Sequence, residues 1–121
     1  MSNGHIIAWL DDLQMSAYLA KISTTHSYEL QFCDTISKIS DKLAPTVVII
    51  DLSSTSEDIL QKIVASKQNH NITIMAYCQE LNGPLLNYFK GMGCGMVFKR
   101  YDLMKNLESI LNKMFNATGI T

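Results

Sequence analysis

The sequence lacks the features that mark several large protein classes. No apolar run approaches the roughly 20 residues that a membrane-spanning helix needs, and the first residues have no basic segment of the kind that opens a signal peptide. Lysine and arginine are scattered and the formal net charge is −1, so the chain has no basic stripe for nucleic acid. We therefore expect a cytoplasmic protein that binds neither a membrane nor nucleic acid directly.

Cysteine and histidine are also scarce, with three of each. The cysteines are odd in number, show no C-x-x-C spacing and lie in or beside apolar segments, which is typical of reduced, buried thiols. The histidines are isolated from one another, whereas metal ligands recur at recognisable spacings. The sequence thus predicts no disulfide framework and no histidine metal site.

What the chain does have is enough apolar sequence for one core. Its 121 residues are 47% hydrophobic and 17% charged, which is ordinary for a globular domain. No internal repeat, linker or low-complexity segment interrupts it. We expect a single domain over residues 1–121, with a core over about 5–115.

The most informative stretch is Pro45-Thr-Val-Val-Ile-Ile-Asp51-Leu. Its four consecutive β-branched apolar residues are too few for a helix and do not alternate with polar ones, so they predict a strand buried on both faces of a parallel sheet. Asp51 stands at its carboxyl end. In open parallel sheets ligands and chemistry gather at that end of the strands, which makes Asp51 the first candidate site residue.

Strand and helix patterns alternate along the whole chain. Strands are predicted over residues 5–10, 28–33, 45–52, 71–78 and 95–98, the second of them half-buried at an edge. The helices between them are indicated by apolar stripes, which are Met15, Tyr18, Leu19 and Ile22; Ile36, Ile39 and Leu43; Ile59 or Leu60, Ile63 and Val64; Leu85, Phe89 and Met92; and Leu103, Leu107, Ile110, Leu111 and Met114. Units this short require right-handed crossovers. The prediction is an α/β fold, a flavodoxin-like (βα)5 three-layer sandwich with parallel strand order 2-1-3-4-5.

Local signals predict where some helices begin and end. Ser54 with Glu57, or Thr55 with Asp58, fits a capping box before the third helix. Pro84 suits the first turn of the fourth. The glycines between Gly91 and Gly95 precede a strand, so they indicate a helix C-cap and turn and not a phosphate loop.

The predicted topology brings three acids together. The first and third strands are neighbours, so Asp11 and Asp12 should converge on Asp51. Carboxylates this close repel one another, and a hard divalent cation with oxygen ligands is the usual remedy, which makes the edge a candidate Mg²⁺ site. Lys99, at the end of the fifth strand, can supply a positive charge to a phosphoryl group or to the acids.

At this point the chain resembles a response-regulator receiver domain over essentially its whole length. The strand that ends in Asp51 resembles the family's phosphoacceptor strand, and Gly95-Met-Val-Phe-Lys99-Arg-Tyr-Asp-Leu resembles its Lys-Pro-Phe segment and the following helix. The resemblance implies that Asp51 takes the phosphoryl group, Asp11 helps to hold Mg²⁺ and Lys99 contacts the phosphoryl oxygens.

Several positions depart from the family pattern. Leu10 stands where the family has the first acid of its pair, and a leucine cannot bind a metal. Tyr77 stands where receivers carry a small Ser or Thr, and its ring would fill the space of a phosphoryl oxygen. Arg100 replaces the proline after the lysine, and Met96 stands in for the switch aromatic.

Simpler interpretations stay open for the site residues. Asp51 fits a solvated or capping carboxylate as well as a phosphoacceptor. Lys99 fits a structural partner that holds Asp51 and Asp11 together. Asp12 fits an acid of the first helical turn better than a metal ligand, and Tyr77 fits a packing residue better than a catalytic phenol.

The sequence therefore predicts a receiver-like signalling domain, of an atypical kind, that works by binding another protein. The partner is a histidine kinase or a downstream effector, the predicted surface lies on the fourth helix, fifth strand and fifth helix, and a homodimer is a further option. No enzyme activity is expected beyond phosphorylation and dephosphorylation at Asp51. One alternative is a competent Mg²⁺-dependent phosphoacceptor. Another is a flavodoxin-like cofactor binder, which Asp11-Asp12 disfavours because they would repel a flavin phosphate.

Overall fold

The computed structural model describes residues 4–33, 46–66 and 72–117. They contain the strands β1 (Gly4–Trp9), β2 (Tyr28–Phe32), β3 (Thr46–Asp51), β4 (Ile72–Cys78) and β5 (Met96–Lys99), and the helices α1 (Leu13–His26), α2 (Glu57–Ser66), α3 (Gly83–Met92) and α4 (Arg100–Ala117). The helix predicted around Ile36, Ile39 and Leu43 lies outside the described residues. Within the described ranges, no helix has the length and apolar character to cross a membrane.

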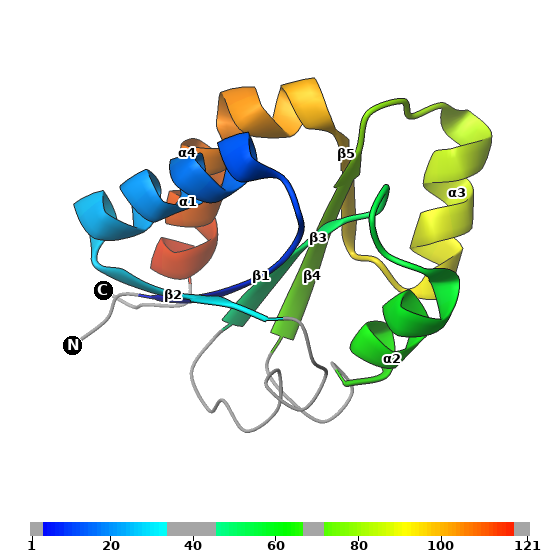
Figure 1. Cartoon of the computed structure of the whole chain (residues 1–121), viewed down its shortest axis with the longest axis horizontal. Coiled ribbons are helices and arrows are strands. Elements are labelled where there is room, and N and C mark those ends of the chain that lie inside the picture. The colour runs from blue at the N-terminus through cyan, green and yellow to red at the C-terminus, as the bar shows by residue number, and fades with distance from the viewer. Residues whose placement is uncertain (1–3, 34–45, 67–71, 118–121) are drawn as a thin grey trace.

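The strands form one parallel sheet in the order β2-β1-β3-β4-β5. The predicted flavodoxin-like topology is thus confirmed. α1 and α4 cover one face of the sheet, and α2 and α3 cover the other (Figure 1). This places the carboxyl ends of all five strands at one edge, where the candidate site residues lie.

β3 lies at the centre of the sheet and supplies both core layers. Val47, Val48, Ile49 and Ile50 are each at most 2% exposed. Because successive side chains of a strand point to opposite faces, Val47 and Ile49 join the cluster under α1 and α4, whereas Val48 and Ile50 join the cluster under α2 and α3. Burying each such side chain contributes about 1.5–3 kcal/mol, so the unbroken apolar run fixes β3 as the central strand.

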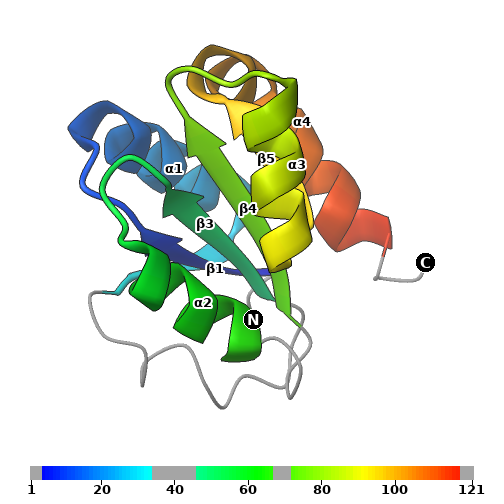
Figure 2. The ribbon, with the colours of Figure 1, turned by 90° about the vertical axis from the view of Figure 1, so that its right-hand side faces the viewer.

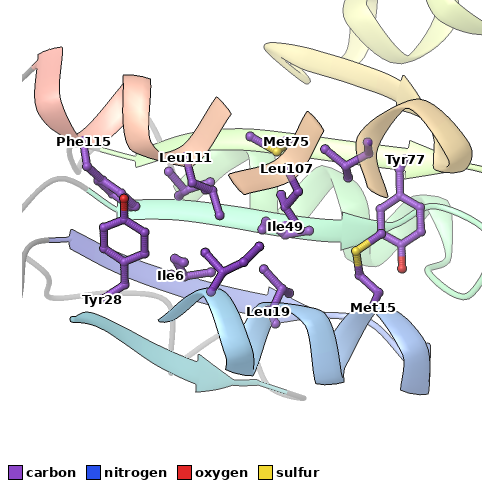
Figure 3. Packing of buried hydrophobic residues seen from close by; sticks show 14 residues of the cluster. Ile6, Met15, Leu19, Tyr28, Ile49, Met75, Tyr77, Leu107, Leu111 and Phe115 are labelled. Carbon is purple, nitrogen blue, oxygen red and sulfur yellow. The ribbon is translucent and has the colours of Figure 1, made fainter. Parts of the chain in front are cut away.

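The cluster under α1 and α4 joins the first helix to the last. It contains Met15 and Leu19 of α1, together with Leu107, Leu111 and Phe115 of α4. Figure 3 shows these side chains meeting over Ile49 of β3, with Tyr28 at one end of the cluster and Tyr77 at the other. The apolar stripe of the last helix therefore faces the sheet as predicted.

The start of α2 differs from the predicted capping box. Ser56 is the residue that caps it: its side-chain oxygen accepts a hydrogen bond from the backbone N–H of Ile59 at 3.2 Å. Ser54 and Thr55 are used differently, because their hydroxyls donate to the backbone carbonyl of Asp51. The capping-box prediction was wrong by one or two residues because these hydroxyls stabilise the turn after β3 instead of the helix.

α3 is less buried than the other helices, and none of its residues is fully buried. Asn82 caps it by accepting a hydrogen bond from the N–H of Leu85 at 2.9 Å. The predicted core position Leu85 is 37% exposed, and Leu86 packs against the core with Phe89 and Met92 instead. The prediction was thus right for Phe89 and Met92 and wrong only for Leu85, whose place toward the core is taken by the adjacent Leu86.

α3 ends at Gly93, as the glycines between Gly91 and Gly95 predicted. Gly93 has a φ of 113°, and its N–H bonds back to carbonyls of the last turn. A Cβ at this position would lie 2.5 Å from Cγ1 of Val64. Glycine is required here for two reasons, the left-handed backbone and the close approach of α2.

Gly93→Ala is therefore expected to lower the free energy of unfolding by about 1–3 kcal/mol. Urea denaturation would measure the change. Gly91→Ala is the matched control because a Cβ there would meet no atom within 4 Å, and its stability should not fall. Equal losses in the two variants would contradict the steric explanation.

Candidate functional site at the carboxyl ends of the strands

Asp51 ends β3 and organises the turn that follows. Its Oδ1 accepts the backbone N–H of Ser53 at 2.9 Å. Its carbonyl oxygen accepts the N–H of Ser54 at 3.2 Å and the hydroxyl of Thr55 at 2.8 Å. The side chain is only partly buried, so Asp51 serves as a turn-stabilising acid and still has one carboxylate oxygen for which no bond is recorded among the described residues.

Tyr77 lies next to Asp51 on the neighbouring strand β4. The two residues are paired in the sheet register, and the N–H of Leu52 donates to the carbonyl of Tyr77 at 2.9 Å. Tyr77 is 1% exposed and belongs to the core cluster under α1 and α4. Its ring packs beside Met15, with the hydroxyl at the edge of the cluster (Figure 3). The packing interpretation of Tyr77 describes this position well.

Asp12 receives the hydroxyl of Tyr77. The phenol donates to Oδ2 of Asp12 at 3.0 Å. Oδ1 of Asp12 accepts the N–H of Met15 at 3.1 Å, which makes Asp12 the N-cap of α1 and not a residue of its first turn. Such a cap typically contributes about 1 kcal/mol. Asp12 is thus hydrogen-bonded to Tyr77 of the core cluster and to the backbone N–H of Met15 in the first turn of α1.

Arg100 completes the group. Its Nε donates to Oδ2 of Asp12 at 2.8 Å and its Nη2 donates to Oδ1 at 3.1 Å, a bidentate pair. The same Nη2 donates to Oε1 of Gln14 at 3.0 Å. The Asp12 and Arg100 side chains are 13% and 20% exposed. The first residue of α4 is therefore tied to the start of α1 across the ends of the strands.

These contacts change the proton affinities of the group. Hydrogen bonds from Arg100 are the largest cause that lowers the pKa of Asp12 from 3.8 to about 2, against an opposing effect of burial. The same pair raises the pKa of Arg100. Burial, and then the charge of Asp51, raises the pKa of Tyr77. At neutral pH the site therefore consists of a carboxylate, a guanidinium and a neutral phenol.

The lowered pKa of Asp12 makes stability depend on acid pH. Because the carboxylate form is favoured in the folded state, its contribution is present above about pH 4 and is lost as pH falls from about 4 to about 2. The expected loss is about 2 kcal/mol. Urea denaturation at several pH values would show this fall in the native protein and a shallower one in Asp12→Asn. Identical pH profiles would contradict the assignment to Asp12.

The other predicted site residues do not join this group. Asp11 is exposed and lines a separate cavity with Trp9, Leu10, Cys33 and Ser54. Lys99 is exposed at the end of β5, and in the described part of the chain no ion pair connects its side chain to Asp11 or Asp51.

The three acids predicted to hold Mg²⁺ are all described, and they do not form a metal-binding group. Across residues 4–33, 46–66 and 72–117, no set of three or more His, Cys, Asp or Glu side chains could hold a metal ion. Asp12 is held by Arg100, Tyr77 and the N–H of Met15. The donor set thus does not fit the predicted ion, because the charge of Asp12 is already balanced by Arg100.

Sequence reasoning missed the role of Arg100. It treated this residue only as a replacement for proline, although a long arginine side chain directly after a strand end can reach an acid across the carboxyl ends of the other strands. The signal available was charge: two adjacent acids after β1, and a lysine-arginine pair at the point where β5 ends. That signal indicated an ion pair at this edge and could not tell which acid would pair with which cation.

Comparisons with known proteins agree with the topology. No protein-family model matches the sequence, and no curated protein matches it. Solved structures do match the fold. A response regulator from Thermotoga maritima has a TM-score of 0.75 at 8% identity, with 95% of this chain and 98% of that chain covered.

Two further structures illustrate the range of similar proteins. A DNA-binding response regulator of the LuxR family from Staphylococcus aureus has a TM-score of 0.71 at 16% identity, covering 93% of this chain and 99% of that one. The pilus assembly protein CpaE from Caulobacter crescentus has a TM-score of 0.63 at 9% identity, covering 91% and 98%. At such low identities the likeness concerns the fold: this chain has the fold of a response-regulator receiver domain.

Proposed function

We propose that this chain is an atypical receiver domain, which passes a signal by binding another protein and does so without metal or phosphorylation. The observation that carries the proposal is the clamp on Asp12, in which Arg100 and Tyr77 hold both carboxylate oxygens. In this arrangement a built-in guanidinium neutralises the acid that a divalent cation would otherwise bind.

The position of Tyr77 next to Asp51 also supports this proposal. Its buried ring lies one strand away from Asp51 in register. A phosphoryl group on Asp51 adds negative charge and acceptor oxygens, and the hydroxyl of the neighbouring buried phenol already donates its hydrogen bond to Asp12. The site is therefore suited to staying in one arrangement and not to switching between two.

The proposed binding surface is formed by α3, β5 and α4, which are the fourth helix, fifth strand and fifth helix of the sequence prediction. These three elements lie side by side at one edge of the sheet (Figure 2). Tyr101 at the start of α4 is 67% exposed, and Lys99 is exposed beside it. Tyr88 of α3 is 46% exposed, but its hydroxyl donates to Glu57 of α2, so it faces away from β5. An exposed tyrosine beside a lysine suits a protein partner that presents apolar and acidic groups.

The surface can be tested by affinity capture with quantitative mass spectrometry, using cells that make the protein. Tyr101→Ala and Lys99→Glu should lose the same captured partner, whether it is a histidine kinase, an effector or a second copy of the chain. Lys62→Glu changes an exposed residue of α2. It is the matched control and should still capture the partner. Equal capture by all the variants would refute the surface.

A competent phosphoacceptor is the second candidate, and the free oxygen of Asp51 is the observation that favours it. In that case Asp51 would attack the phosphoryl donor, Lys99 would contact the phosphoryl oxygens and Asp11 would help to hold Mg²⁺. An ¹⁵N–¹H NMR titration with Mg²⁺ and then beryllofluoride separates the two candidates. Our proposal expects no saturable shift at Asp51, Lys99 or Met96, whereas large shifts there would favour the phosphoacceptor.

A further inference from the structure

A cavity lies at the carboxyl end of the sheet, and none of its lining residues belongs to the Asp12 clamp. Its volume is about 230 Å³, and it is lined by Trp9, Leu10, Asp11, Cys33 and Ser54. Three of these residues end or follow β1, Cys33 follows β2, and Ser54 belongs to the turn after β3. Among the described residues, the lining therefore comes from the carboxyl ends of β2, β1 and β3, which are adjacent in the sheet.

This position is the topological switch point of the sheet. From β1 the chain goes outward to β2, and from there it returns past β1 to β3 and continues in the other direction. The loops after β1 and β3 consequently turn to opposite faces and leave a crevice between them. Open α/β sheets generally bind their ligands in this crevice, so the fold itself favours a binding site here.

The lining defines the chemistry of a ligand. Trp9 and Leu10 are partly buried apolar walls, and Ser54 contributes a hydroxyl. Asp11 is the charged residue of the lining, and no lysine or arginine is among the lining residues in the described part of the chain. Arg100, the cation on the far side of the strand ends, is already held by Asp12 and Gln14. An anion or phosphate would be repelled by this carboxylate, whereas a cation would be attracted to it, and an aromatic residue in the lining suits an organic cation.

We propose that this cavity binds a small organic amine, with the ammonium group at Asp11 and Ser54 and an apolar body against Trp9 and Leu10. Its volume lies below the range of about 300–1,000 Å³ that is typical of drug-sized ligands, so the ligand is of the size of a one-ring amine. Asp51 is linked to the same site, because the N–H of Ser54 donates to its carbonyl oxygen at 3.2 Å. A ligand here would thus be connected to the turn that Asp51 organises.

The chain offers a direct reporter for the test. Trp9 is the only tryptophan in the sequence, so intrinsic tryptophan fluorescence comes from a residue of the cavity lining. The probes are 2-phenylethylamine, 2-phenylethanol and phenylacetate, which share a ring and differ in charge. The amine is expected to change the fluorescence saturably at millimolar concentration, the alcohol more weakly, and the carboxylate not at all.

Variants separate the cavity from general charge attraction. Asp11→Asn should weaken amine binding about three- to tenfold and bring it close to that of the alcohol. Asp58→Asn, an exposed acid on α2, is the matched control and should bind as the native protein does. Ser54→Phe, which places a ring at the cavity, should abolish binding of both the amine and the alcohol.

The proposal is overturned if no probe gives a saturable change in fluorescence or at the Trp9 indole N–H in an ¹⁵N–¹H spectrum. It is also overturned if Asp11→Asn and Asp58→Asn bind the amine equally. Addition of Mg²⁺ distinguishes the amine from a metal, since competition that depends on Asp11 would reassign the site to a cation of another kind. None of these outcomes touches the proposed protein-binding surface, which lies on α3, β5 and α4.

Discussion

Tyr77→Ala is expected to lower the free energy of unfolding by about 3–5 kcal/mol. The side chain is 1% exposed and is among the largest fully buried ones in the described chain. Removing it leaves a cavity between β4, α1 and α4 and also takes away the phenol that donates to Asp12. Urea denaturation followed by circular dichroism would measure the change as a lower midpoint with an unchanged slope.

Tyr77→Phe separates the two contributions. It keeps the ring and removes only the hydroxyl, and Asp12 keeps its bonds to Arg100 and to the N–H of Met15. The expected loss is about 1 kcal/mol, that of one hydrogen bond. If Tyr77→Phe were as destabilising as Tyr77→Ala, the ring would not be the packing element that we describe.

Arg100→Ala is the substitution with the second largest expected effect, a loss of about 2–3 kcal/mol. Removing one member of a largely buried ion pair leaves its partner unbalanced, and buried pairs of this kind lose about 3–5 kcal/mol. The Asp12 and Arg100 side chains keep 13% and 20% of their exposure, so water lessens the loss. The variant should also raise the pKa of Asp12 toward its ordinary value, because the largest cause of the lowering is removed.

Two variants test the geometry of this pair. Arg100→Lys keeps the charge but cannot donate two parallel hydrogen bonds, so it should recover only part of the loss. Lys105→Ala removes an exposed cation from the same helix and should change stability by less than about 0.5 kcal/mol. Full recovery in Arg100→Lys would mean that charge alone, and not the bidentate contact, stabilises the site.

The fold could be predicted because its signals are local and repeated. The apolar run before Asp51 fixed the central strand, since four β-branched residues without polar alternation fit only a strand covered on both faces. The short spacing of the strands then required parallel crossovers. Two details were wrong, the cap of α2 and the choice of Leu85 for the inner face of α3. Each depends on which of several adjacent hydroxyls or leucines turns inward, and neighbouring positions in the sequence offer equal candidates.

The candidate site was predicted in position but not in its contacts. Topology correctly placed Asp11, Asp12, Asp51 and Lys99 at one edge, and the resemblance to receiver domains added Tyr77. It could not show that Asp12 pairs with Arg100 while Asp11 is exposed. The directions of two adjacent loop side chains depend on the backbone angles of the loop, and no sequence pattern specifies these angles. The clamp depends on contacts between residues far apart in the sequence: the N-cap of α1, Tyr77 of β4 and Arg100 of α4. For this reason it could not be predicted from local patterns.

We propose that the chain works without metal-dependent phosphorylation at Asp51, because Arg100 and Tyr77 hold Asp12. The most direct test of this proposal is the intact mass of the native chain after incubation with acetyl phosphate and Mg²⁺, with Asp51→Asn in parallel. Our account predicts that neither protein gains mass. A gain of one phosphoryl group in the native chain that is absent in Asp51→Asn would contradict it and would identify Asp51 as a working phosphoacceptor.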